Sequence, residues 1–114
     1  MKENLISGYN NIVSEKSIIG KDVYIANNCI IEDDVSIGNK VYIDNNTVIR
    51  SGTRIGDNTF IGANCVIGEC LMGFIMDRRP HRQEMTIGND SVIRSGTIIY
   101  SGSIIGNNFK PDIR

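Results

Sequence analysis

Apolar residues return every six positions along most of the chain, with one interruption. An aliphatic residue, isoleucine in every case except Val13, occupies positions 13, 19, 25, 31, 37, 43, 49, 55, 61 and 67, and then 87, 93, 99 and 105. A small or β-branched residue stands two positions before most of them. In a strand, residues two apart point to the same side, so each six-residue unit is predicted to place two side chains inward.

A second pattern marks where each short strand ends. Three positions after most of the aliphatic residues stands Asn, Asp or Gly, the residue types that best tolerate a left-handed backbone. These corner residues are Asp22, Asn28, Asp34, Asn46, Gly52, Asn58, Asn64, Asp90, Gly96, Gly102 and Asn108. Lys16 and Lys40 are exceptions. A strand and a corner every six residues predict a coil that stacks on itself, as in hexapeptide-repeat β-helices.

The repeat over residues 13–110 resembles that of the hexapeptide-repeat acyltransferases. The resemblance implies an all-β fold, a single-stranded left-handed parallel β-helix; the left hand comes from the resemblance, because ordinary parallel crossovers are right-handed. Three six-residue units close one triangular coil. We expect nearly five coils in a domain over residues 13–114, with residues 1–12 as an N-terminal lead-in that caps the first coil.

The last part of the repeat, residues 86–109, resembles sugar and nucleotide-sugar acetyltransferases in particular. In similar enzymes this segment continues into a Thr-Gly-His stretch and further coils, and that histidine is the catalytic base. Here the sequence reads Lys110-Pro111-Asp112-Ile113-Arg114 and ends. The resemblance therefore implies a chain that is C-terminally short relative to active relatives.

The interruption of the repeat predicts an extruded loop over residues 73–85. It contains the only histidine of the chain, His81, together with Arg78, Arg79 and Arg82. The resemblance implies that such a loop reaches the adjacent subunit and that these arginines bind the phosphates of coenzyme A or a sugar nucleotide. Arginine suits phosphate because its planar guanidinium donates two parallel hydrogen bonds. The alternative is that they are solvated loop charges.

Acyl transfer to an amine or hydroxyl needs a base for the acceptor's proton. His81 is the only candidate by residue type, and the resemblance implies a catalytic histidine at the subunit interface. Its neighbours are cations that do not orient it, so a surface histidine is the alternative. Exposed turn residues are expected beside the pantetheine arm of the donor, or are ordinary corner residues: Ser95, Ser101, Gly102, Asn107 and Lys110.

The outward residues sort into three faces. Two are continuously apolar, one with Ile30, Val48, Val66 and Ile98, the other with Tyr24, Tyr42, Phe60 and Val92. The third is mixed, with Ile18, Ser36, Arg54, Thr86 and Ile104. Monomers rarely expose large apolar patches. We therefore predict a homotrimer in which the two apolar faces pack against neighbours, as in trimers of the resembling family; a weakly associating monomer is the alternative.

Composition and charge narrow the classes of function and the cellular locations that remain open. A net charge of −1 argues against nucleic-acid and membrane-surface binding. No apolar run approaches the ~20 residues of a membrane span, and the N-terminus has no signal-peptide pattern, so a cytoplasmic location is expected. Cys29 and Cys65 are both inward and two coils apart, roughly 10 Å, which is beyond disulfide reach. A single histidine cannot supply the zinc ligands of the carbonic-anhydrase branch of this fold, and no metal is expected.

The resemblance implies an acyltransferase that works at trimer interfaces. The resemblance implies acetyl-CoA, or another acyl-CoA, as donor and an amino or hydroxyl group of a sugar or sugar nucleotide as acceptor. The alternative is a catalytically inactive trimeric scaffold or interaction module.

Overall fold

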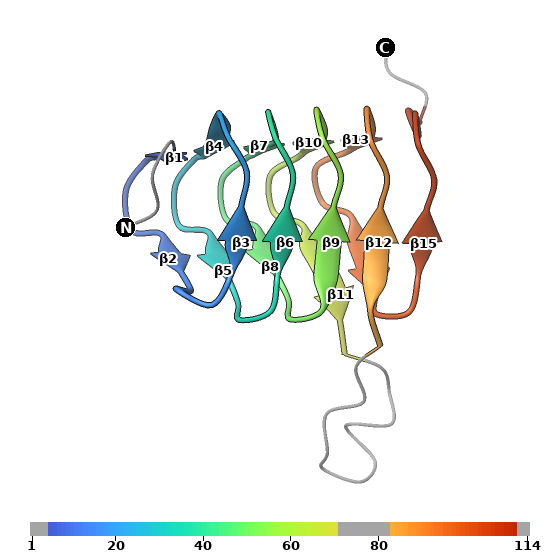
Figure 1. The fold of residues 1–114 in the computed structure, drawn as a ribbon, viewed down its shortest axis with the longest axis horizontal. Coiled ribbons are helices and arrows are strands. Elements are labelled where there is room, and N and C mark those ends of the chain that lie inside the picture. Colours follow the sequence, from blue (N-terminus) through green and yellow to red (C-terminus); the bar gives the residue numbers. More distant parts are fainter. Residues whose placement is uncertain (1–4, 71–82, 112–114) are drawn as a thin grey trace, which may run out of the picture.

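A computed structural model describes residues 5–70 and 83–111 of the chain, and these residues form fifteen short strands and no helix. The strands build three five-stranded sheets, wrapped around one axis as a triangular prism (Figure 1). The first sheet contains β1 (Leu5–Ser7), β4 (Val23–Ile25), β7 (Tyr42–Ile43), β10 (Phe60–Ile61) and β13 (Val92–Ile93). The second contains β2 (Ile12–Val13), β5 (Ile30–Ile31), β8 (Val48–Ile49), β11 (Val66–Glu69) and β14 (Ile98–Tyr100). The third contains β3 (Ile18–Ile19), β6 (Ser36–Ile37), β9 (Thr53–Ile55), β12 (Met85–Ile87) and β15 (Ile104–Ile105).

Each strand pairs in parallel with the strand one coil away. Tyr24 lies opposite Tyr42 and Ile37 opposite Ile55, a separation of 18 residues along the chain. The predicted left-handed parallel β-helix of about five coils is therefore confirmed. The ladder begins at β1, inside the segment predicted as a lead-in, because Leu5 pairs with Val23.

The two inward rows form the core. The inward isoleucines at six-residue spacing from Ile25 to Ile67, with Ile87 and Ile93, are at most 3% exposed. The inward aliphatic residues are only partly buried in the first and last coils. Cys29 and Cys65 are buried free thiols. Burial raises the pKa of both thiols because desolvation disfavours the thiolate. The core is thus a stack of aliphatic and small side chains, as the repeat predicted.

The corners adopt the predicted left-handed backbone. All eleven predicted Asn, Asp and Gly corners have positive φ, for example Asp34 at 60° and Gly52 at 85°. Lys40, an exception in the sequence pattern, has a φ of 57° all the same. Register between coils therefore dictates this backbone conformation even for a residue type that disfavours it.

The prism has three faces and three edges. The first sheet is called the aromatic face, the second the aliphatic face and the third the mixed face; the outward residues group on them as predicted. The asparagine edge, between the aromatic and aliphatic faces, comprises residues 8–11, 26–29, 44–47, 62–65 and 94–97. The loop edge, between the aliphatic and mixed faces, comprises the described residues 14–17, 32–35, 50–52, 70, 83–84 and 101–103. The glycine edge, between the mixed and aromatic faces, comprises 20–22, 38–41, 56–59, 88–91 and 106–108.

The interruption of the repeat falls on the loop edge. The chain leaves the coil after β11 and returns at β12, but residues 71–82 lie outside the described residues, and with them most of the predicted loop 73–85. Gln83 and Glu84 are exposed, whereas Met85 is buried in β12. Across the described residues, none lies in a helix that could cross a membrane.

Candidate functional site

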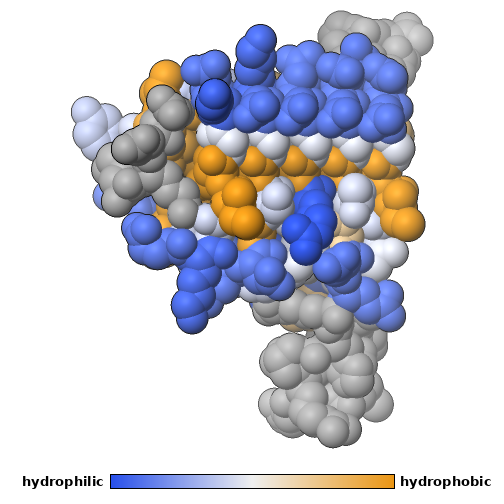
Figure 2. Space-filling view, in the orientation of Figure 1, coloured by the Kyte–Doolittle hydropathy of each residue, from blue (hydrophilic) through white to orange (hydrophobic). Residues whose placement is uncertain are grey.

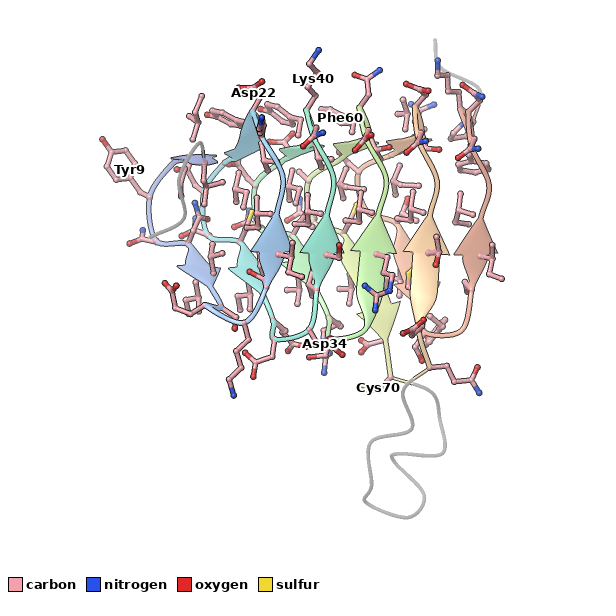
Figure 3. The ribbon with its side chains drawn as sticks, viewed as in Figure 1. Tyr9, Asp22, Asp34, Lys40, Phe60 and Cys70 are labelled. Carbon is pink, nitrogen blue, oxygen red and sulfur yellow. The ribbon has the colours of Figure 1, made fainter. Side chains whose placement is uncertain are left out.

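Charged side chains gather along the loop edge. The described ionisable residues there are Glu15, Lys16, Glu32, Asp33, Asp34, Arg50 and Glu84, with Glu69 at the adjoining end of β11. Figure 3 shows Asp34 and Cys70 on this edge, opposite Asp22 and Lys40 on the glycine edge. The edge that extrudes the loop is therefore also the one richest in groups able to bind or transfer protons.

Arg50 is the centre of a partly buried ion cluster on this edge. Its Nε donates to Glu32 Oε1 at 3.2 Å and its Nη1 to Glu69 Oε1 at 2.9 Å. The three side chains are only 24–33% exposed, and Nη2 lies 3.6 Å from Cys70 Sγ. Because one guanidinium holds two carboxylates, the cluster fixes the corner from which the loop departs and carries one net negative charge.

A hollow of about 340 Å³ lies beside this cluster, over the first coils of the aliphatic face. Its lining is Ile12, Ser14, Ile30, Ile31, Glu32, Asp33 and Ser51. The Ser14 hydroxyl donates to Asp33, and Glu32 Oε1 accepts the Ser51 N–H at 2.9 Å. An aliphatic floor with carboxylate and hydroxyl groups on the rim suits a ligand with both apolar and hydrogen-bond-donating parts.

A second hollow of about 340 Å³ lies over the last described coil and is mostly apolar. Its lining is Ile93, Arg94, Thr97, Ile99, Ile105, Phe109 and Pro111. Lys110, predicted as a neighbour of the donor's arm, is exposed next to it. This hollow offers contact area but few polar groups. The loop edge is therefore the candidate site, because it has the groups that could bind a polar ligand or transfer a proton.

Two predicted site residues, Ser101 and Gly102, lie on the loop edge. The Ser101 N–H donates to the carbonyl of Glu69 at 2.9 Å, which ties the last described coil to the Arg50 cluster. Ser101 Oγ is buried without a hydrogen-bond partner among the described residues. Gly102 has a φ of 86°, and the amide oxygen of Gln83 lies 2.6 Å from the position that a Cβ there would take.

Two other predicted site residues lie on different edges and are engaged within the coil. On the asparagine edge, Ser95 Oγ accepts the N–H of Ala63 at 2.9 Å. On the glycine edge, Asn107 Oδ1 accepts the N–H of Asn89 at 2.8 Å. The five predicted neighbours of the donor's arm therefore do not converge within one chain.

The remaining predicted site residues are His81, Arg78, Arg79 and Arg82. They fall in residues 71–82, outside the described residues, so their predicted roles stay predictions. Within the described residues, no group of three or more His, Cys, Asp or Glu side chains is arranged to hold a metal ion.

The Arg50 cluster was not predicted from the sequence. A signal was present, because Glu32 and Arg50 are 18 residues apart and therefore stack on adjacent coils of the same edge. Glu69 is 19 residues further on, since the β11–β14 register shifts between Ile67 and Glu69. Because of that irregularity, a strict six-residue count does not place Glu69 next to Arg50.

Comparisons with known proteins support the predicted hexapeptide repeat. Residues 34–69 match the family model "Bacterial transferase hexapeptide (six repeats)". The fold is similar to the acetyltransferase domain of PglB from Neisseria gonorrhoeae FA1090, solved in complex with acetyl coenzyme A, with a TM-score of 0.60 and 15% sequence identity. The match covers 94% of this chain and 53% of that one, so this chain spans about half of the similar domain. No protein of curated function matches the sequence significantly.

At 15% identity the structural likeness concerns the fold alone, whereas the family match concerns the repeat itself. The family match over residues 34–69 thus supports the hexapeptide-repeat resemblance predicted from residues 13–110, and the structural match supports the predicted fold. The chain is a left-handed β-helix, and its residues 34–69 match the hexapeptide repeat of bacterial transferases.

Proposed function

We propose that the protein is an acyltransferase that uses an acyl-CoA, most simply acetyl-CoA, and works between neighbouring subunits of a homotrimer. The acceptor is an amino or hydroxyl group of a sugar or sugar nucleotide. The observation that carries the proposal is the match of residues 34–69 to the transferase hexapeptide repeat. The bound acetyl coenzyme A of the similar PglB domain supports the choice of donor.

The loop edge supplies the groups that such a reaction requires. Arg78, Arg79 and Arg82 lie in the sequence between Cys70 and Gln83, which are both on this edge, and three guanidinium groups suit the phosphates of the donor. The hollow at Glu32 and Asp33 presents carboxylates to which the hydroxyl groups of a sugar acceptor can donate. We assign the general base to His81, which would take the proton of the acceptor's hydroxyl or amino group as that group attacks the thioester carbonyl. The C–S bond then breaks, and the departing sulfur of coenzyme A would take the proton from the imidazolium.

Calorimetric titration of acetyl-CoA into the protein, with sedimentation in parallel, tests the proposal. We expect micromolar binding, one donor per subunit, in a species of three times 12.6 kDa. Adenosine diphosphate serves as a control ligand that keeps the nucleotide and its diphosphate, and it should bind more weakly because it lacks the pantetheine arm. A well-formed trimer without donor binding would instead favour the non-enzymatic scaffold.

Replacement of the loop's ionisable residues separates the roles within the site. Arg78→Gln, Arg79→Gln and Arg82→Gln together should weaken donor binding, whereas His81→Ala should leave donor binding intact and lower turnover by about 10²–10⁴-fold. Unchanged turnover of His81→Ala with an identified acceptor would eliminate His81 as the base.

A further inference from the structure

Five inward hydroxyl and thiol groups share one hydrogen-bonding pattern across the coils. Each donates to a backbone carbonyl 15 residues further along the chain, or 29 residues where the interruption intervenes. In each pair the accepting residue directly follows an inward isoleucine. The pairs are Cys29 with Asp44, Thr47 with Gly62, Thr59 with Gly88, Cys65 with Arg94 and Ser91 with Gly106, at 2.8–3.2 Å. Ser17 and Thr97 instead donate within their own turns.

Thr53 follows neither pattern, because the backbone at its expected acceptor is turned. By the same spacing its acceptor would be the carbonyl of Gly68, which directly follows Ile67. Thr53 Oγ1 is instead buried without a hydrogen-bond partner among the described residues, and it lies 2.6 Å from the position that a Cβ on Gly68 would take. Gly68 has a φ of 88°. A positive φ is absent from the other glycines that follow an inward isoleucine, which are Gly20, Gly38, Gly56, Gly62, Gly88 and Gly106.

The turned backbone is a β-bulge with one extra residue. In the pairing of β11 with β14, Ile67 lies opposite Ile99 and Glu69 lies opposite Tyr100, so Gly68 is left without a partner. Glycine in a left-handed conformation is common at such bulges. Because successive strand residues point to opposite sides, the extra residue is either present or absent, and no intermediate register exists.

The bulge gives Glu69 the contacts that join the loop edge to the last described coil. Its Oε1 accepts Nη1 of Arg50 at 2.9 Å, and its backbone carbonyl accepts the N–H of Ser101 at 2.9 Å. The hydroxyl of Ser101, which is also buried without a partner among the described residues, lies beside the same bulge. A regular register would place Gly68 in the column of Arg50 and remove Glu69 from it.

The two registers exchange interactions of similar strength. The bulge forms an ion pair and a backbone hydrogen bond, but it leaves the Thr53 hydroxyl buried and unpaired. Burying a hydroxyl without a partner costs about as much free energy as a hydrogen bond to a charged group contributes. The regular register would restore the bond of Thr53 and give up the contacts of Glu69. Neither register is therefore strongly preferred.

We propose that Gly68 is a two-position hinge that couples the Arg50 cluster to the last described coil. In the second position Gly68 has a negative φ, its carbonyl accepts the Thr53 hydroxyl, and Glu69 leaves Arg50 and Ser101. Figure 2 shows hydrophilic groups along the lower border of the mixed face, where the loop edge runs, so a carboxylate that leaves Arg50 can turn toward water. The hinge does not depend on the proposed acyl transfer.

A pair of isosteric substitutions tests the unpaired hydroxyl. Thr53→Val removes a hydroxyl that lacks a partner, so we expect the melting temperature to rise by about 5 °C. Thr47→Val is the matched control and should lower the melting temperature by a similar amount, because Thr47 Oγ1 donates to the carbonyl of Gly62 at 2.8 Å. A decrease in both variants would overturn the proposal, since Thr53 would then have a partner in the described position.

Amide hydrogen exchange measured by NMR tests the second position. The N–H of Ser101 is bonded only while the bulge is present, whereas the N–H of Gly96 donates to Ala63 in a regular corner of the same coil. Relative to Gly96, we expect Thr53→Val to slow the exchange of Ser101 about tenfold, because it removes the hydrogen bond of the second position. Arg50→Met should speed the exchange about tenfold, because it removes the ion pair of the described position.

A further variant and the internal reference keep the test decisive. If Arg50→Met folds poorly, Glu69→Gln weakens the same ion pair and should change the exchange of Ser101 in the same direction. The Gly96 amide corrects for any change in global stability. A Ser101 amide that does not respond in opposite directions to Thr53→Val and to loss of the ion pair, measured against Gly96, overturns the hinge.

Discussion

The side-chain oxygen of Asn89 accepts the backbone N–H of Asp57 at 2.8 Å and fills the space that a side chain on Gly56 would need. The same relationship recurs along the glycine edge, between Asn39 and Gly20 and between Asn107 and Gly88. Glycine is therefore required here by the side chain of the next coil and not by its own backbone angles.

Gly56→Ala should destabilise the protein, because the new Cβ would meet the backbone of Gly88 and Asn89 as well as the Asn89 side chain. We expect a loss of about 1–3 kcal/mol in the free energy of unfolding, measured by urea denaturation at one protein concentration. Gly106→Ala is the matched control, since no atom lies within 4 Å of its added Cβ. Equal losses in both variants would contradict the steric role of the ladder.

Lys40→Asn should stabilise the protein. Lys40 has a φ of 57°, a left-handed conformation that is sterically less favourable for lysine than for asparagine. We expect a gain of about 0.5–1 kcal/mol in the same denaturation experiment. Lys21→Asn, an exposed lysine of the same edge without a positive φ, should change stability little. A similar gain at both positions would point to surface charge as the cause.

Arg50→Met should destabilise the loop edge, because the carboxylates of Glu32 and Glu69 would lose a partly buried partner. With the cluster a quarter to a third exposed, we expect a loss of about 1–3 kcal/mol. Arg54→Met is the comparison: its 3.3 Å pair with Glu84 is 48% and 70% exposed, so its loss should stay below about 0.5 kcal/mol. Thermal unfolding of both variants against wild type measures the difference.

Tyr42→Asp should dissociate the proposed assembly, because it places a charge in the middle of the aromatic stack. Ser36→Asp puts the same charge on the mixed face, in β6, the strand that precedes β7 along the chain, and should leave the assembly intact. Sedimentation velocity at equal concentration compares them. Dissociation by Ser36→Asp and not by Tyr42→Asp would place the contact on the mixed face.

Cys29 and Cys65 should resist thiol reagents in the native protein, whereas Cys70 should react, since only Cys70 is partly exposed. Burial raises the pKa of Cys29 and Cys65, so the folded state keeps protons that the unfolded chain releases. Stability should therefore fall as pH rises above about 8.5, where unfolded cysteines ionise. Cys29→Ala with Cys65→Ala should reduce this alkaline loss; an unchanged pH slope would assign it to other groups.

The sequence by itself determined the fold, because each six-residue unit repeats the same inward aliphatic position and the same left-handed corner. The isoleucine row set the core, and corners such as Asn28 and Gly52 set the turns, so residues 18 apart had to stack. The grouping of outward residues into two apolar faces and one mixed face followed from the same count. The contact between Gly56 and Asn89 was not predicted, although the same spacing places these two residues on adjacent coils of one edge.

Only the tertiary structure decided which polar residues pair across the coils. The cluster of Arg50 with Glu32 and Glu69 depends on a register shift in β11 that breaks the repeat. Ser95 and Asn107 look free in the sequence, yet their side chains accept backbone N–H groups of the preceding coil. The physical reason is that a repeat constrains backbone position and burial, whereas hydrogen bonds and ion pairs depend on side-chain placements that vary from coil to coil.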